Sequence, residues 1–391
     1  MAKNFFDKIR PTFSEGGKLS WLHSSFDAFE TFFFVPNRVT KKGGVHVKDC
    51  VDLKRILIIV VLSLVPALLF GIWNLGEQHS IVFGLGWGFW EKVWYGFVKI
   101  IPLYLVSYIV GLGIEFASAQ MKGHEVSEGY LVSGFIIPLI VPVDVPWWML
   151  TLAVAFAVII GKEVFGGTGM NIWNPALLAR AFLFFSYPSK MSGDSVWVGG
   201  LSKALEGGTP WKGGEVVDAL SGATPLSHAS LDGLSQAGTS VLDLFVGNIP
   251  GAVGETSVIA ILIGAFILLC TGVASWKTML SVFVGGALTA ALFHSTGLSE
   301  LTWYEHLFLG GFCFGAVFMA TDPVTSARTE TGKYFYGLLI GVVAILIRVL
   351  NPGYPEGMML AILLMNIFAA LFDYLVVDRN IRRRAKRVLN K

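Results

Sequence analysis

The residues with the clearest capacity for chemistry lie in a glycine-rich polar stretch near the middle of the 391-residue chain. Asp218 is followed after two residues by Ser221, Gly222, Ala223 and Thr224. Thr224 offers a hydroxyl that could accept a covalent group, and Gly222 and Ala223 leave room for a bulky donor to approach the backbone. The Asp218 carboxylate could orient a metal-bound donor. Because Ser, Gly and Asp are also ordinary turn residues, the alternative is a turn without chemistry.

The spacing resembles the acceptor sequence on which a flavin transferase attaches FMN to a threonine through a phosphoester bond. On this resemblance Thr224 is the attachment site, and Asp218, Ser221, Gly222 and Ala223 complete the motif. A chance match at all these positions is expected on the order of once in a thousand chains of this length. We therefore expect a covalent redox cofactor and a role in electron transfer.

A second polar group lies shortly before this stretch. Asn171 and Asn174 are about one helical turn apart, and their amides suit the polar edge of a flavin or its ribityl hydroxyls. The alternative is a helix cap at Asn174, because Pro175 favours the first turn of a helix. Arg180 follows within an apolar segment, where an unpaired charge costs at least about 2.5 kcal/mol. Arg180 must therefore have a partner: a flavin, a buried carboxylate or another subunit.

Three acidic residues are expected near the cytoplasmic ends of apolar segments, namely Glu128, Asp322 and Asp373. Carboxylate oxygens at such positions could bind sodium ions on their way into a pump. The alternatives are a favourable charge at a helix N-terminus for Glu128 and hydrated acids at the membrane surface for the other two.

Composition indicates an integral membrane protein. The chain is 54% hydrophobic and only 14% charged, with a mean hydropathy of +0.66. A soluble domain of this length would carry far more charge. The three cysteines are far apart and form no CxxC pair, which argues against an iron–sulfur or zinc site built by this chain alone.

The predicted fold is an all-α integral membrane protein with about ten transmembrane helices. The spans are expected at 55–75, 93–115, 129–143, 146–162, 174–188, 256–275, 278–295, 303–320, 334–350 and 357–377. Ten Lys and Arg residues within 1–55 and seven within 379–391 place both termini in the cytoplasm. No nucleic-acid partner is expected, because the basic residues cluster at membrane edges.

Five spans on each side of the central loop mean that any internal duplication must be inverted in the membrane. The predicted organisation has five parts: a cytoplasmic N-terminal extension (1–54), a first five-helix half (55–188), an outer loop that bears Thr224 (189–255), a second five-helix half (256–378) and a basic cytoplasmic tail (379–391). Glycine and proline breaks recur in both halves, although these residues are also simply common in membrane helices.

Over nearly its whole length the chain resembles the B subunits of the sodium-pumping NADH:quinone oxidoreductases of bacteria. It is also related to the D subunits of the Rnf electron-transport complexes. The matching residues are 162–169, Asn171, 174–176, 180–182, 221–224, 254–257 and 321–325. The long N-terminal extension favours the quinone-reductase family over its ferredoxin-linked relative, which stays open as an alternative.

The resemblance implies an oxidoreductase subunit of the bacterial inner membrane, with covalent FMN on Thr224 and non-covalent riboflavin near Asn171 and Asn174. Electrons would pass from NADH, bound elsewhere, to a quinone, coupled to Na⁺ export. The implied partners are subunits A, C, D, E and F of a six-subunit pump, a flavin transferase, the quinone, Na⁺ and the lipid membrane. A channel or transporter for a small neutral solute is a further alternative, because inverted five-span halves also suit that class.

Overall fold

The computed structural model describes residues 2–13, 23, 26, 30, 53–122, 126, 129–193, 196–202, 222–227, 234, 239–351 and 356–389. All regular elements in these ranges are helical, which confirms the predicted all-α class. Glu128, Asp218 and Ser221 lie outside the described residues, so their predicted roles stay predictions. The N-terminal extension contributes α1 (Ala2–Phe13).

The first half of the chain forms five helices, α3 to α7. The long helices α3 (Leu53–Val82) and α4 (Phe89–Lys122) pack along each other. Three shorter helices follow: α5 (Tyr130–Ile140), α6 (Trp147–Ile159) and α7 (Pro175–Ser186). Helix α4 packs on α5 and α6, and α6 packs on α7. Two short helices, α8 (Pro188–Met191) and α11 (Val241–Val246), lie in the segment that leads to the second half.

The second half contains α12 (Val258–Cys270), α13 (Trp276–Ser295), α16 (Glu330–Leu350) and α17 (Gly357–Leu389). The span expected at 303–320 is broken into α14 (Trp303–Phe308), α15 (Phe312–Phe314) and a π-helical turn (Gly315–Met319). The break occurs at Gly310, whose φ of 62° is left-handed and therefore favours glycine. Hydropathy alone could not reveal this break, because the segment is apolar on both sides of it.

Six helices within the described ranges are long and apolar enough to cross a membrane: α3, α4, α6 with its continuation to Phe165, α13, α16 and α17. Three more apolar helices, α5, α7 and α12, are shorter. This content confirms a multi-pass helical membrane protein.

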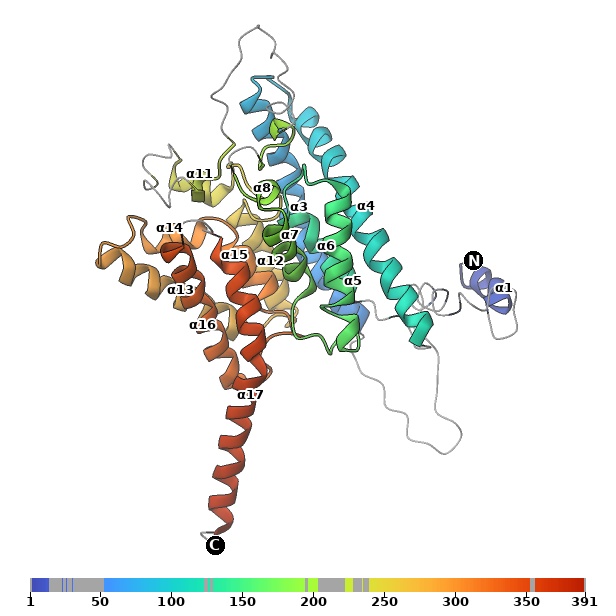
Figure 1. Ribbon diagram of the computed structural model, residues 1–391, viewed down its shortest axis with the longest axis vertical. Coiled ribbons are helices and arrows are strands. Elements are labelled where there is room, and N and C mark those ends of the chain that lie inside the picture. The colour runs from blue at the N-terminus through green and yellow to red at the C-terminus, as the bar shows by residue number, and fades with distance from the viewer. Residues whose placement is uncertain are drawn as a thin grey trace.

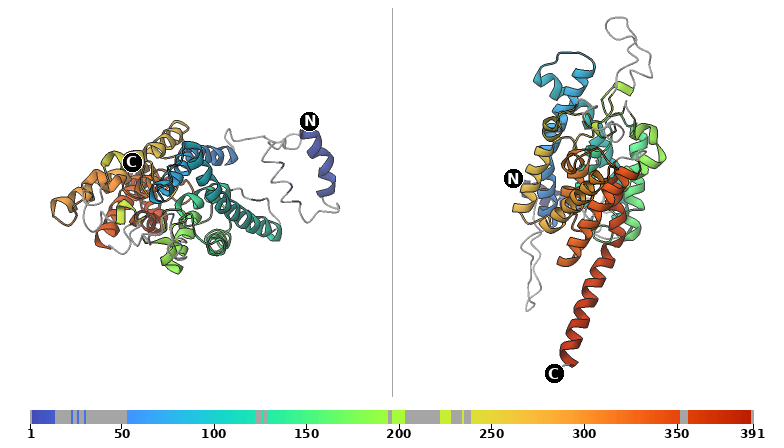
Figure 2. Two further views of the ribbon diagram at one scale, coloured as in Figure 1. Left: turned by 90° about the horizontal axis from the view of Figure 1, so that it is seen from above. Right: turned by 90° about the vertical axis from the view of Figure 1, so that its left-hand side faces the viewer.

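The two halves lie side by side, with the blue-to-green helices on one side and the yellow-to-red helices on the other (Figure 1). They meet where α12 packs on α3 and where α17 packs on α7. The end of α17 extends beyond the other helices, as Figure 2 shows from a second direction. Its exposed residues between 379 and 387 are mostly arginine and lysine, which suits a water-facing tail.

Close helix packing in the second half depends on glycine. A Cβ atom at Gly341 of α16 would collide with the backbone of α13 at Val282 and at Gly285 and Gly286. Backbone atoms cannot rotate away as a flexible side chain can, so the two helices would have to separate. Small residues at such positions allow membrane helices to approach closely.

We expect Gly341→Ala to lower the melting temperature of the purified chain in detergent, because overpacking costs about 1–3 kcal/mol. The matched control is Gly113→Ala in α4, where an added Cβ meets nothing within 4 Å. In an open helical position this change should be neutral or stabilise by about 0.5–1 kcal/mol. Equal melting temperatures for the two variants would contradict the proposed packing.

Candidate functional site

Two pockets, each with a few polar side chains in a largely apolar lining, lie at opposite ends of α12 and of the broken segment 303–319. The first, called here the Asn174 cavity, has a volume of about 100 Å³ and lies at the start of α7, the end of α12 and the residues after the π-helical turn. The second, called the Thr224 pocket, has a volume of about 20 Å³ and lies where α12 begins and α14 ends. Helix α12 has 13 residues and is therefore about 20 Å long, which separates the two pockets.

The Asn174 cavity brings together the two predicted asparagines. Asn174 is the N-cap of α7: its Oδ1 accepts the Ala176 N–H at 3.0 Å, which confirms the helix-cap alternative. Asn171 precedes the helix, and its amide donates to the Trp173 carbonyl at 3.0 Å. Both residues line the cavity, and a carboxamide has a second N–H that a ligand could use.

Asp322 also lines this cavity. One cavity therefore contains a residue that the sequence predicted to bind sodium and two that it predicted to bind a flavin. Its carboxylate accepts hydrogen bonds from Asn174 Nδ2 at 3.3 Å, from the Val324 N–H at 3.1 Å and from the Thr325 hydroxyl at 2.9 Å. Burial raises the pKa of the Asp322 carboxyl, although these three bonds act in the opposite direction. Asp322 thus connects the start of α7 to the chain after the π-helical turn.

A buried ion pair that sequence reasoning did not single out stands beside this cavity. Lys162 lines the cavity, and its ammonium group donates to Glu115 of α4. The Lys162 and Glu115 side chains are only 3% and 1% exposed, so the pair is withdrawn from solvent. A charge inside an apolar segment needs a counter-charge, and that rule applied to both residues would have predicted the pair.

Thr224 is partly buried at the second pocket, together with Gly310, Thr256 and two carboxylates, Glu255 and Glu356. Its hydroxyl oxygen accepts the Ser227 N–H at 3.3 Å, and its carbonyl oxygen accepts the Ser227 hydroxyl at 2.7 Å. The described part of the motif, residues 222–224, therefore leads into a short turn.

Thr256 carries an unsatisfied polar atom at this pocket. The residue is 3% exposed. Within the described ranges, its hydroxyl oxygen has no hydrogen-bond partner. Leaving a buried polar group unpaired costs about 1–3 kcal/mol. A hydrogen-bond acceptor such as a phosphate oxygen would satisfy this donor.

Arg180 has the partners that its burial required. One guanidinium nitrogen donates to Glu255 and the other to Glu356. The Arg180 and Glu255 side chains are 3% and 4% exposed, while that of Glu356 is 21% exposed. Burial raises the pKa of the Glu255 carboxyl to about 7, against the lowering effect of Arg180. The carboxylate alternative is confirmed, and Arg180 lies beneath the Thr224 pocket, away from the asparagines.

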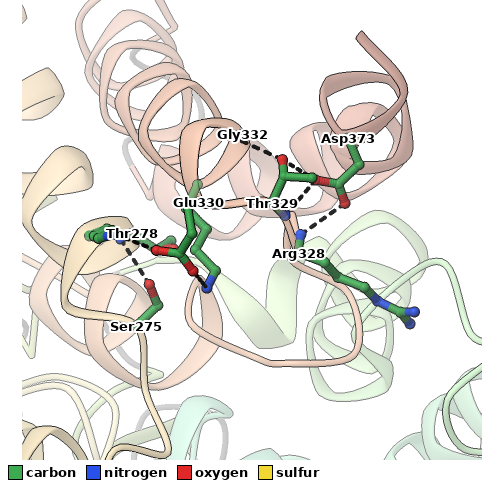
Figure 3. A network of polar contacts seen from close by, with 9 residues as sticks. Ser275, Thr278, Arg328, Thr329, Glu330, Gly332 and Asp373 are labelled. Carbon is green, nitrogen blue, oxygen red and sulfur yellow. Dashed lines mark hydrogen bonds and ion pairs between the residues drawn. The ribbon is translucent and has the colours of Figure 1, made fainter. Parts of the chain in front are cut away.

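Asp373 has a different surrounding from Asp322. Figure 3 shows its carboxylate facing the start of α16, where it accepts the Arg328 and Thr329 N–H groups, both at 2.8 Å, and the Thr329 hydroxyl at 2.6 Å. Thr329 in turn is the N-cap of α16 and accepts the Gly332 N–H at 3.2 Å. Asp373 therefore anchors the first turn of α16 to α17.

The acids do not gather into a metal centre within the part of the chain that the structure describes. No group of three or more His, Cys, Asp or Glu residues there is arranged to hold a metal ion. Asp322 and Asp373 each bind protein donors, and Asp373 does not line the Asn174 cavity.

These features define a multi-pass helical membrane protein with a small pocket near each end of α12. Residues 40–382 match the family described as NQR2, RnfD, RnfE. The chain is 46% identical to the B subunit of the Na(+)-translocating NADH-quinone reductase of Chromohalobacter salexigens, over 98% of this chain and 96% of the relative. It is 42% identical to the proteins of the same name from Ectopseudomonas mendocina and Klebsiella pneumoniae, over 98% of this chain and 98% and 99% of those relatives. The chain therefore belongs to the NQR2, RnfD, RnfE family.

We expect Asp373→Ala to loosen the start of α16, because three donors lose their acceptor. The cost should be about 1–2 kcal/mol, as for the loss of a helix cap. Amide hydrogen exchange over 328–333 should accelerate, and Asp373→Asn, which keeps one acceptor oxygen, should lie between the wild type and the alanine variant. The control is Asp378→Ala, which removes an exposed ion pair to Arg382 and should change stability by less than about 1 kcal/mol. Unchanged exchange in Asp373→Ala would show that the carboxylate does not hold the helix.

Proposed function

We propose that this chain is the membrane-embedded B subunit of a bacterial sodium-translocating NADH–quinone reductase, and that it carries FMN on Thr224 through a phosphoester bond. The family and the names of its relatives support the oxidoreductase complex. The observation that supports the attachment most directly is the position of Thr224 at a pocket with the unpaired hydroxyl of Thr256. A flavin stores one or two electrons, so it can pass electrons between one-electron donors and a quinone.

The proposed membrane topology has ten crossings, with both termini in the cytoplasm and Thr224 on the outer side. A packing order that recurs in both halves supports this topology. In the first half, α4 contacts α5 and α6, and α6 contacts α7. In the second half, α13 contacts α14 and α16, and α16 contacts α17. On this reading the broken segment 303–319 corresponds to α5, and the two five-helix halves are inverted repeats. The segment 303–319 is broken at Gly310, and its counterpart α5 contains Pro138 inside the helix.

For the non-covalent riboflavin we propose the Asn174 cavity, on the cytoplasmic side. Its apolar walls, which include Ile136 and Phe318, suit a flat aromatic ring, and Asn171 and Asn174 could orient the polar edge of that ring. The Lys162 ammonium group, held by Glu115, places a positive charge at the same cavity.

The sodium path and the partners belong to the same proposal. Na⁺ would enter on the cytoplasmic side near Asp322, with Glu128 and Asp373 as further candidates. Subunits A, C, D, E and F, a flavin transferase and a quinone are the proposed partners. Asp322 is favoured among the acids because it lines a cavity, whereas the described contacts of Asp373 serve α16.

The test is to express the full chain with a flavin transferase and to examine flavin fluorescence after denaturing electrophoresis. We expect fluorescence from the wild type and from Thr224→Ser, which keeps a hydroxyl, and none from Thr224→Val. In the assembled complex, Thr224→Val should reduce quinone reduction to background. Thr296→Val, at an exposed position at the end of α13, is the matched control and should remain fluorescent. Fluorescence from Thr224→Val, or normal quinone reduction by its complex, would refute the attachment site.

A further inference from the structure

The Thr224 pocket has a balance of charge that an attached phosphate must disturb. Two carboxylates, Glu255 and Glu356, line the pocket, and Arg180 donates to both of them. The charge of Arg348, in the last turn of α16, also interacts with Glu356. Among the residues that the structure describes, these two guanidinium groups offset the two carboxylates. A phosphodiester on Thr224 adds one negative charge to a pocket that contains the buried Glu255 carboxylate, and a like charge beside a buried carboxylate is costly.

The pocket also contains a donor that the protein leaves unused. The Thr256 hydroxyl is buried and has no partner within the described ranges, although Thr256 and Thr224 line the same pocket. If one carboxyl of the pocket binds a proton, it loses its negative charge and becomes a hydrogen-bond donor. A phosphate in the pocket could then accept hydrogen bonds from that carboxyl and from the Thr256 hydroxyl.

We propose that Glu255 binds a proton when Thr224 carries the phosphoester, and that the protonated Glu255 carboxyl and the Thr256 hydroxyl donate hydrogen bonds to the phosphate. The inference rests on the proposed attachment of FMN and assigns two further residues to that site. The step forms one O–H bond with a proton from water and moves no electrons. Two guanidinium groups then offset one carboxylate and one phosphodiester.

Glu255 is the better candidate of the two carboxylates because it is more deeply buried. Its side chain is 4% exposed, whereas that of Glu356 is 21% exposed and can keep its charge hydrated. Among the described residues, three charged groups lie near the Glu255 carboxylate. Arg180 comes from α7, Glu356 precedes α17, and Arg348 of α16 donates to the backbone carbonyl of His306 in α14. Burial and the charge of Glu356 raise the pKa of Glu255, and Arg180 lowers it.

The experiment is ³¹P NMR spectroscopy of the full flavinylated chain, purified in detergent without phospholipid. A phosphodiester has no ionisation near neutral pH, whereas free FMN is a monoester that titrates near about pH 6. A pH-dependent shift of the covalently bound phosphorus therefore reports the ionisation of a neighbouring group. Free FMN is recognised by its own titration and by its removal during denaturing purification.

We expect the bound phosphorus resonance of the wild type to titrate once, with a midpoint well above the ordinary range of a glutamate, because burial and the nearby negative charges raise the pKa of Glu255. In Glu255→Gln the resonance should be present but independent of pH. Glu356→Gln is the matched control: the titration should persist, with a lower midpoint because a like charge next to Glu255 has been removed. Thr256→Val should change the chemical shift of the resonance while the titration persists.

A wild-type resonance that does not move with pH, or a titration that survives in Glu255→Gln, would overturn the inference. An unchanged midpoint in Glu356→Gln would also contradict it, and this variant decides the question if Glu255→Gln fails to fold. Absence of any covalent flavin from the wild type would overturn the proposed function as well. A covalent flavin with a pH-independent resonance would leave the proposed function intact.

Discussion

The ion pairs of Arg180 hold together the end of the molecule where Thr224 lies. Arg180 belongs to α7 in the first half, while Glu255 and Glu356 lie just before α12 and α17 of the second half. Their contact therefore joins the middle of α7 to the starts of α12 and α17. Removing one partner of such a buried pair costs about 3–5 kcal/mol, because the remaining charge stays withdrawn from water. The positions of the Glu255 and Glu356 carboxylates in the Thr224 pocket depend on these bonds.

The same three segments position both pockets. Helix α7 begins at the Asn174 cavity and carries Arg180 toward the Thr224 pocket, while α12 runs between the two. The broken segment 303–319 connects them a third time, with Gly310 at one pocket and Phe318 at the other. A Cβ atom at Gly311 would meet the Glu255 carboxyl group, so the break also makes room for the ion pairs. The two pockets are thus built in part from the same segments.

Much of the fold follows from the sequence, because hydropathy and helix signals are local. The all-α membrane class is confirmed, and so are the cap at Asn174 and the need of Arg180 for a partner. The identity of that partner was out of reach, since Glu255 and Glu356 lie 75 and 176 residues away in the chain. The break at Gly310 was missed because averaged hydropathy does not register a change of backbone conformation.

The anchoring of α16 by Asp373 shows another limit of reasoning from sequence. The sequence does not show whether an acid near the end of an apolar segment binds an ion or the N–H groups of another helix. Only the packing of α17 against α16 distinguishes these uses, and here the carboxylate contacts α16. By contrast, the contact between Asn174 and Asp322 joins two sites that the sequence had suggested separately.

The most direct test of the central claim is peptide mapping by mass spectrometry of the chain purified from its native membrane, with fragmentation that localises any modification. The account predicts that the mass added by one FMN phosphoester is found on the fragment containing Thr224, and that fragment ions place it on that residue. An unmodified Thr224 in an active, flavin-containing complex, or FMN localised to another residue of this chain, would contradict the account.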